Sequence, residues 1–364
     1  MGTDDRPEAP RLCCARIVHG PNIPRYREPL LTDFLNRKQA LEVTIVVCCY
    51  NAERTITRTL ESLRQQTYPV QEILVIDDAS SDRSYELVRD YAATFRSVRV
   101  LRNSRNRGPA FCRQLGLEEA QSECILFFDA DDIAKPRLLE RQARILESDP
   151  SLLGVGCYAH YFESEADVPK SLGLLKVGPT NRAAALKQFQ QNKLVFMTVV
   201  TLIWRRDALA VGGYRQDLLP NSKGLRYEDY AEDLDLWCRM ADLGASGRHF
   251  IAIPEPLFFY RKPTGSLSTR NVAVMQLKMR WIKDCMIRRR KGLGERRLAE
   301  FLASRTLFQR LADRRSDLAA AFYKRAGFAY ASRRYLRMGV FLGLVAVTSP
   351  KLILQKLKTQ SVQS

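Results

Sequence analysis

The sequence predicts an α/β fold, with a mostly parallel sheet flanked by helices, followed by a basic α-helical C-terminal region. Short apolar runs alternate with helical segments, and these runs are too continuous for strands that face water on one side. Charge is also uneven, because positive residues accumulate after residue 270. We therefore expect a partly disordered extension at 1–42, an α/β domain at 43–270 and a basic helical region at 271–364.

The first half of the α/β domain has the clearest pattern. Each predicted strand is an apolar, often β-branched run, and a helix follows where apolar residues recur at helical spacing, as at Ile56, Leu60 and Leu63. In chain order we predict a strand at 43–49, a helix from 56, a strand at 72–76, a helix to about 95, a strand at 98–101, a helix at 109–120 and a strand at 124–128.

The pattern is looser after about residue 150. The apolar run 194–204 predicts a strand, Gly212-Gly213-Tyr214 predicts a turn, and 230–240 predicts a helix. From residue 272 onward the composition is helical and basic.

Composition excludes several classes of protein. With 46% hydrophobic and 27% charged residues, the 364-residue chain is neither mainly disordered nor collagen-like. The net charge is +18, and residues 271–364 hold 21 Lys and Arg against 5 Asp and Glu. The rest of the chain is nearly neutral, so the positive charge belongs to one region.

Cysteine usage and hydropathy indicate a cytoplasmic setting. The nine cysteines are an odd number, and no apolar signal segment occurs near the N-terminus. We expect reduced thiols and a cytosolic location. The uncharged run 338–350 is shorter than the roughly 20 residues that span a bilayer, so we predict no transmembrane helix.

Polar residues follow three of the predicted strands. They are Asn51, the pair Asp77 and Asp78, and the pair Asp129 and Asp131. In parallel sheets, ligands bind beyond the carboxyl ends of the strands, so these residues are expected to form one site.

Each motif has a chemical and a structural interpretation. Asp129 and Asp131 are hard oxygen ligands for Mg²⁺ or Mn²⁺ beside a diphosphate, or they form a solvated turn that caps a helix. Asp77 or Asp78 accepts a hydrogen bond from a uracil N–H or a ribose hydroxyl, or else this turn caps the next helix through Asp77, Ser80 or Asp82. Tyr50 stacks on a base, or it is a half-buried turn residue.

Two further motifs carry charge. Arg113, one of several arginines near Gly108, binds a diphosphate or belongs to a solvated basic face. Glu232 and Asp233 lie beside bulky apolar residues that raise a carboxyl pKa and suit a general base. Alternatively they are exposed helix acids, and Glu228-Asp229 is a rival pair.

In joint order and spacing, these motifs resemble the inverting family 2 glycosyltransferases, which have the GT-A (Rossmann-like) fold. The resemblance covers roughly residues 42–270. It rests on Thr44–Asn51, Gln65–Pro69, Glu72–Ser80, Asp129–Asp132, Gly212–Tyr214 and Glu232–Trp237.

The resemblance implies roles for individual residues. Asp233 is the catalytic base, and Asp131 with Asp129 holds the metal ion. The remaining residues are implied to bind the nucleotide sugar: Tyr50 on the base, Asn51 beside it, Asp77 and Asp78 on base and ribose, and Arg113 on the diphosphate side.

The chain departs from the family pattern twice. It has Cys112-Arg113-Gln114 where Ala-Arg-Asn is frequent, and Tyr260-Arg261-Lys262-Pro263 where the family often ends in His. The resemblance therefore implies no metal or phosphate contact from a His at this position.

The resemblance implies an inverting, metal-dependent transfer of a hexosyl or N-acetylhexosaminyl group from a UDP-sugar to a glycan or lipid-linked hydroxyl, in cell-surface polysaccharide synthesis. The alternatives are a sugar-phosphate nucleotidyltransferase and an inactive binding protein. The first would have a Gly-rich loop where this chain has Tyr50–Glu53, and intact Asp78, Asp131 and Asp233 argue against the second.

Three interpretations of the basic region remain open. Aromatic and apolar residues alternate with Arg and Lys, which favours peripheral binding to an anionic membrane at its inner face. A helical bundle packed on the α/β domain is the second interpretation. Nucleic-acid binding is the third, and no recognised motif supports it.

Overall fold

The structure is a computed structural model that describes residues 40–162, 169–220, 222, 224–261, 271–331 and 334–350. Most of the predicted extension at 1–42 lies outside the described residues, as do Lys262 and Pro263 and the last part of the basic region.

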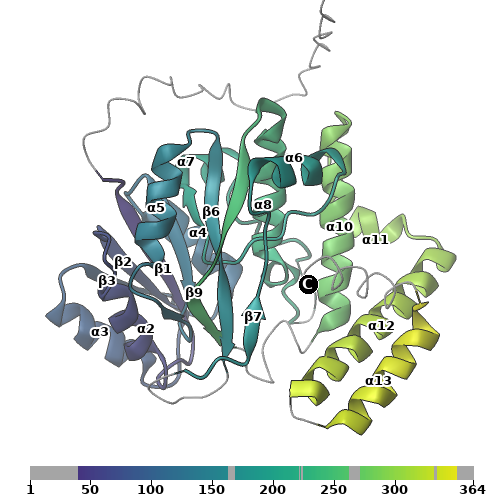
Figure 1. The fold of residues 1–364 in the computed structure, drawn as a ribbon, viewed down its shortest axis with the longest axis horizontal. Helices are drawn as coiled ribbons and strands as arrows, with labels where there is room; N and C mark the ends of the chain where they lie inside the picture. Colours follow the sequence, from purple (N-terminus) through teal and green to yellow (C-terminus); the bar gives the residue numbers. More distant parts are fainter. Residues whose placement is uncertain are drawn as a thin grey trace, which may run out of the picture.

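The described strands form one nine-stranded sheet in the order β3-β2-β1-β4-β8-β6-β9-β5, with β7 paired to β6 (Figure 1). Their bounds are β1 Val43–Cys49, β2 Glu72–Asp77, β3 Val98–Arg102, β4 Cys124–Asp129, β5 Ile133–Ala134, β6 Leu152–Phe162, β7 Gly173–Leu175, β8 Leu202–Trp204 and β9 His249–Arg261.

The sheet is mixed, whereas the sequence predicts a mostly parallel one. Strands β3, β2, β1 and β4 are parallel, as their apolar runs indicate. Strand β8 is antiparallel to both of its neighbours, β4 and β6. The long strands β6 and β9 are parallel to each other, but Pro254 and Pro256 of β9 lie where their register shifts, which breaks the strand pattern in the sequence.

Helices cover both faces of the sheet. Their bounds are α2 Ile56–Arg64, α3 Ser84–Thr94, α4 Pro109–Glu119, α5 Leu138–Ser148, α6 Arg182–Gln190, α7 Arg205–Ala210, α8 Glu232–Ala241, α10 Val272–Arg290, α11 Leu298–Ala303, α12 Leu307–Ala331 and α13 Tyr335–Thr348. Two one-turn 3-10 helices, η1 Tyr227–Asp229 and η2 Asp242–Ser246, flank α8.

Alternate residues of each strand face two different cores. Ile45 and Val47 of β1 belong to one cluster, which α2 and α5 cover. Val46 belongs to the other, which α4 and α8 cover. Helix α4 lies so close to the sheet that a Cβ added at Gly116 would collide with the side chain of Val46. Glycine at this position therefore sets the distance between α4 and β1.

The second core continues into the basic region. Trp281, Ile282 and Cys285 of α10 are buried in the same cluster as Trp237 of α8. Helix α11 adds Phe301. The first 30 or so residues after 270 therefore pack on the α/β domain, as the bundle interpretation expects.

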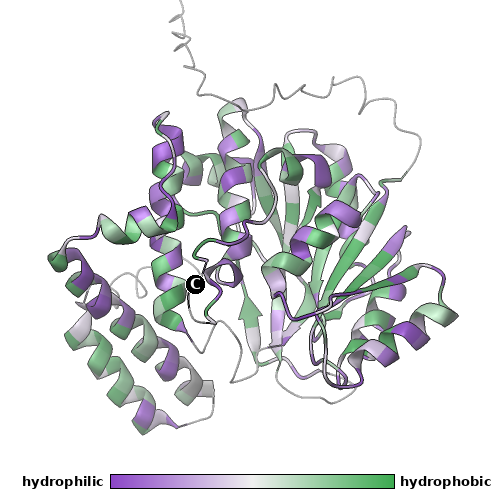
Figure 2. Ribbon diagram, turned by 180° about the vertical axis from the view of Figure 1, so that it is seen from behind, coloured by the Kyte–Doolittle hydropathy of each residue, from purple (hydrophilic) through white to green (hydrophobic). Residues whose placement is uncertain are grey.

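Helices α12 and α13 form an antiparallel pair beside α10 (Figure 1). Phe322 stacks on Phe341 across the pair, with ring centroids 6.4 Å apart, and Arg315 donates to the carbonyl of Thr348. Hydrophobic residues are concentrated along the strands and along α13 (Figure 2). No helix in the described ranges is both long enough and apolar enough to cross a membrane.

Two predicted elements are shorter than the sequence indicates. Only Leu202–Trp204 of the run 194–204 is a strand, because Thr198 and Thr201 bond to nearby carbonyls and turn the chain before it. The helix predicted over 230–240 begins at Glu232, after Ala231 adopts a left-handed conformation with φ of 50°.

Candidate functional site

The carboxyl ends of β2, β1 and β4 meet at one edge of the sheet. Cys48 of β1 lies opposite Asp129 of β4, and Cys49 lies opposite Asp77 of β2. Two of the predicted acidic residues therefore flank the end of β1, at the position where ligands bind in α/β sheets.

Asp78 is buried, and the loop between β3 and α4 occupies its carboxylate. Oδ1 accepts from the backbone N–H of Arg107 at 2.8 Å and from the side-chain amide of Asn103 at 2.7 Å. Oδ2 accepts from the N–H of Gly108 at 2.7 Å. Hydrogen bonds to a carboxylate are stronger than neutral ones, so Asp78 shapes this loop. Its expected contact with a base or ribose stays a prediction.

Asp77 is also buried but is less completely paired. Its Oδ2 lies 3.2 Å from Nε of Arg102 and accepts from the N–H of Ser80 at 3.3 Å. Its Oδ1 is buried and has no hydrogen-bond partner among the residues described. An unpaired buried acceptor costs free energy, which makes Oδ1 an open position for a donor.

Tyr50 and Asn51 lie at the end of β1. The Asn51 Oδ1 accepts from the N–H of Ser81 at 2.9 Å and so joins this end to the turn after β2. The Tyr50 side chain is half exposed, which leaves its ring accessible for stacking. Like Asp77 and Asp78, these two residues do not line the main cavity of the site.

A cavity of about 610 Å³ adjoins the end of β4. It brings together the other four predicted residues, Arg113, Asp129, Asp131 and Asp233. Several further residues line the cavity although no sequence motif indicates a role for them: Tyr161, Met197, Tyr260, Arg261, Met275, Met279 and Lys324.

Arg113 is the buried cation of the cavity. One guanidinium nitrogen lies 2.9 Å from Oδ1 of Asp129, and another pairs with Glu232. Although burial acts against its charge, these two carboxylates raise the pKa of Arg113 well above its usual value. Burial raises the pKa of Glu232 to about 7, against the effect of Arg113.

Arg113 is held in place by contacts on both sides of α4. At its start, Oδ1 of Asp229 accepts from the N–H of Ala110, and a Cβ at Gly108 would collide with the Asp229 carboxylate. Beside Arg113, the side chain of Gln114 accepts from the N–H of Tyr214 at 2.7 Å. The lengthened amide at position 114 therefore anchors the predicted Gly-Gly-Tyr turn.

Asp131 faces the cavity with little compensating charge. Burial and the neighbouring charge of Asp129 raise its pKa to about 6, and Nη1 of Arg261 lies 4.0 Å from its Oδ2. The next residue, Asp132, is fully buried and accepts from the backbone N–H of Arg261 at 2.8 Å. This hydrogen bond joins β9 to the Asp129–Asp132 motif. Nothing in the sequence indicates this role of Asp132.

Asp129 and Asp131 fit a divalent cation. Both offer hard oxygen ligands, and the mutual repulsion that raises the pKa of Asp131 is relieved by a positive ion. No group of three or more His, Cys, Asp or Glu with metal-site geometry occurs in the described part of the chain. Two carboxylates leave room for phosphate oxygens and water, as is usual for Mg²⁺.

Asp233 lies in the first turn of α8 and is partly buried. Its Oδ1 accepts from the N–H of Leu234 at 2.7 Å, and it has no ion-pair partner among the described residues. Burial raises the pKa of Asp233, and Arg113 opposes the rise. A carboxylate without a fixed cation, exposed to a cavity, has the properties of a general base.

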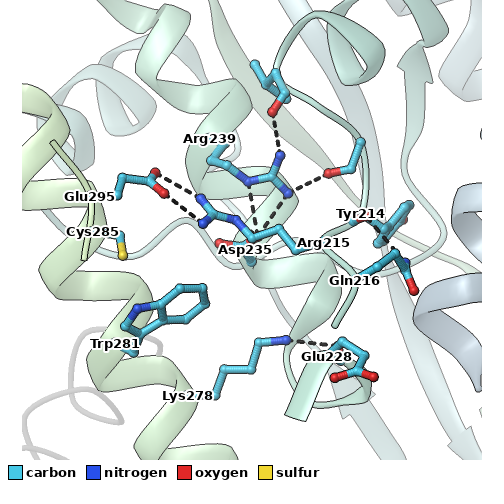
Figure 3. A network of polar contacts seen from close by, with 12 residues as sticks. Tyr214, Arg215, Gln216, Glu228, Asp235, Arg239, Lys278, Trp281, Cys285 and Glu295 are labelled. Atoms are coloured by element: carbon cyan, nitrogen blue, oxygen red, sulfur yellow. Dashed lines mark hydrogen bonds and ion pairs between the residues drawn. The ribbon is translucent and has the colours of Figure 1, made fainter. Parts of the chain in front are cut away.

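A network of charges joins α8 to the turn at 211–215 and to the segment after α10 (Figure 3). Asp235 lies 3.0 Å from Arg215 and 2.9 Å from Arg239. Arg239 also donates to the carbonyls of Val211 and Gly213 at 2.6 Å, and Arg215 pairs with Glu295 at 2.7 Å. The network fixes the direction in which α8 presents its first turn.

Comparison with family models matches residues 44–212 to glycosyl transferase family 2. An uncharacterized glycosyltransferase of Haemophilus influenzae is 28% identical over 226 residues, which cover 60% of this chain and 65% of that protein, just under two thirds of its length. The putative glycosyltransferase EpsE of Bacillus subtilis is 27% identical over 232 residues, or 63% of this chain and 76% of that protein.

Among solved structures, the mannosyltransferase PcManGT from Pyrobaculum calidifontis, in complex with GDP-Man and Mn²⁺, is 17% identical. The alignment covers 88% of this chain and 92% of that chain, with a TM-score of 0.48. Residues 1–349 of Staphylococcus aureus TarS align over 85% of this chain and 89% of that chain, with 16% identity and a TM-score of 0.48.

The contacts of Asp78 predict that Asp78→Asn destabilises the fold, because an amide cannot accept from all three donors at once. We expect the free energy of unfolding in urea to fall by about 1–3 kcal/mol. Asp90→Asn changes an exposed carboxylate on α3, and its free energy of unfolding should stay within about 0.5 kcal/mol of the wild-type value. Equal stability of Asp78→Asn and the wild type would contradict the structural role.

Proposed function

Residues 44–212 match glycosyl transferase family 2, and on this basis we propose that the chain carries out an inverting transfer of a hexosyl or N-acetylhexosaminyl group. The donor is a nucleoside-diphosphate sugar, with UDP as the proposed nucleotide, and the acceptor is a hydroxyl of a glycan or a lipid-linked glycan. The observation that carries this proposal is that Asp233, Arg113, Asp129 and Asp131 line one cavity.

In the proposed reaction, Asp233 takes the proton from the acceptor hydroxyl as the oxygen attacks the anomeric carbon. The bond to the nucleoside diphosphate breaks in the same displacement, which inverts the configuration. Asp131 and Asp129 would hold Mg²⁺ or Mn²⁺, which neutralises charge on the leaving diphosphate when bound.

A second cavity supports entry of the acceptor from the side of α10. It has a volume of about 750 Å³ and shares two lining residues, Phe196 and Met279, with the cavity that holds Asp233. The two cavities therefore meet at these side chains. The lining of the second cavity combines apolar residues such as Ile287 and Phe301 with charged ones such as Lys193 and Arg280, which suits an acceptor that has both a lipid part and a polar part.

We also propose that the α12–α13 pair binds the inner face of an anionic membrane, in keeping with a role in cell-surface polysaccharide synthesis. Apolar side chains on its outer surface are exposed at helical spacing on α13: Leu336 (91%), Val340 (64%) and Val347 (75%). On α12, Phe308 is 81% exposed. Exposed apolar stripes with Arg and Lys beside them are typical of helices that lie in a membrane interface.

For the base, we predict that Asp233→Asn binds UDP with Mn²⁺ as the wild type does but transfers sugar about 10²–10⁴-fold more slowly. Binding is measured by calorimetry and turnover by release of UDP from UDP-sugars. Asp217→Asn, an exposed position outside the cavity, should transfer at the normal rate. Full turnover by Asp233→Asn would exclude Asp233 as the base.

For the metal site, Asp131→Ala should lose about tenfold or more of the affinity that Mn²⁺ adds to UDP binding, because one of two carboxylate ligands is missing. The comparison is calorimetry of UDP with Mn²⁺ and with EDTA. Asp90→Ala on α3 serves as the control. An undiminished effect of Mn²⁺ in Asp131→Ala would refute this ligand assignment.

For the membrane surface, the double variant Leu336→Glu, Val340→Glu should bind anionic liposomes about tenfold or more weakly, since two apolar side chains no longer enter the lipid. Flotation with anionic and with neutral liposomes measures this. Leu172→Glu removes an exposed apolar residue outside the pair and should have no effect. Salt-sensitive RNA or DNA binding without lipid binding would favour the nucleic-acid interpretation instead.

A further inference from the structure

Lys278 on α10 is a buried cation outside the segment that matches the family. Its side chain is 1% exposed. Nζ donates to the backbone carbonyl of Glu228 at 2.8 Å (Figure 3). No ion pair joins Nζ to a carboxylate within the described ranges, so the ammonium is buried with a single hydrogen bond.

Packing alone does not account for a lysine at this position. The other residues on the buried face of α10 are apolar or weakly polar: Trp281, Ile282, Cys285 and Met286. A methionine would fill the same volume without the cost of removing a charge from water. Burial lowers the pKa of Lys278, and nearby carboxylates oppose that effect.

These carboxylates lie in η1 and in the first turn of α8. They are Glu228, Asp229, Glu232 and Asp235. Three of them have an arginine partner: Asp229 pairs with Arg226, Glu232 with Arg113, and Asp235 with Arg215 and Arg239.

Asp233 in the same turn has no such partner in the described structure. Burial raises the pKa of Asp233, and Arg113 opposes this rise most strongly. Lys278, the cation that α10 adds beside this acidic turn, acts in the same direction as Arg113.

We propose that Lys278 is a positioning residue for Asp233. It anchors the turn before α8 through the carbonyl of Glu228, and it supplies the positive charge that balances the first turn of α8. The assignment of Asp233 as the base rests on the proposed function, whereas the effect of Lys278 on the charge of that turn does not.

Other charged or titratable groups also act on Asp233 or line its cavity. They include Arg113 of α4, Asp129 of β4, Glu232 of α8 and Tyr214 of the Gly-Gly-Tyr turn. The cavity adds Asp131, Asp229, Tyr161, Tyr260, Arg261 and Lys324. Only Lys278 differs between each variant and the wild type, so a change in the midpoint reports the loss of its charge, including its effect on the ionisation of Glu232.

The test compares three substitutions at one position. Lys278→Met removes the charge and the hydrogen bond, Lys278→Gln removes the charge but keeps a donor, and Lys278→Arg keeps the charge. The readout is the pH midpoint of the Asp233 carboxyl carbon in protein labelled with ¹³C-aspartate. Its resonance is assigned by its absence in Asp233→Asn.

We expect the midpoint to rise by about 0.5–1 pH unit in Lys278→Met and Lys278→Gln, and to stay unchanged in Lys278→Arg. Because a carboxyl with a raised pKa is protonated at higher pH, the acid limb of kcat/KM for UDP-sugar turnover should move upward with it. Arg289→Met is the matched control. It removes an α10 cation that pairs with Asp242 and Glu295, and it should leave the midpoint in place.

An unchanged midpoint in both Lys278→Met and Lys278→Gln would overturn the proposal. So would a shift of equal size in Arg289→Met, which would indicate a general loosening of α10. If Lys278→Met does not fold, the comparison of Lys278→Gln with Lys278→Arg decides. The titration needs no turnover, so loss of the proposed function would show separately, as full activity of Asp233→Asn.

Discussion

The guanidinium of Arg113 lies between carboxylates from distant parts of the chain, Asp129 at the end of β4 and Glu232 at the start of α8. A buried charge is stable only if its partners are fixed, so the surrounding structure must hold all three residues. Asp78 and Asp229 hold the loop and the first turn of α4, and Gln114 binds the Gly-Gly-Tyr turn. The acidic motif and the proposed base thus line one cavity because this arginine connects them.

The sequence predicts correctly those strands whose local hydrophobic pattern matches their burial in the fold. Strands β1, β2 and β4 are apolar on both faces, and their sequence shows it. Strand β9 contains Pro254 and Pro256, so its pairing depends on a register shift that no local pattern encodes. In the site, residue type and position after a strand pointed to Asp129 and Asp131. The hydrogen-bond partners of Asp78 and Asp132 come from segments that are distant in the sequence. No local pattern in a single sequence therefore reveals them.

Part of the positive charge after residue 270 is paired or buried inside the structure. Along α10, arginines pair with acids of the α/β domain and of α12, as Arg290 does with Asp242 and Arg280 with Asp317. These pairs hold the helices together and contribute little to the outer field of the protein. From the sequence alone, the charge of the basic region is expected to affect where the protein is located and not the chemistry of its site. The burial of Lys278 beneath α8 shows that this separation is incomplete.

The core shared by α8, α10 and α11 has a consequence for the order of events during synthesis. Trp237 packs in the same cluster as Trp281 and Phe301, which leave the ribosome later than the motifs of the parallel strands. The nascent chain thus completes strands β1 to β4 while one side of α8 still lacks its cover. We expect the site to reach its final geometry only after α11 has been synthesised, so a chain truncated before α11 would expose the apolar face of α8.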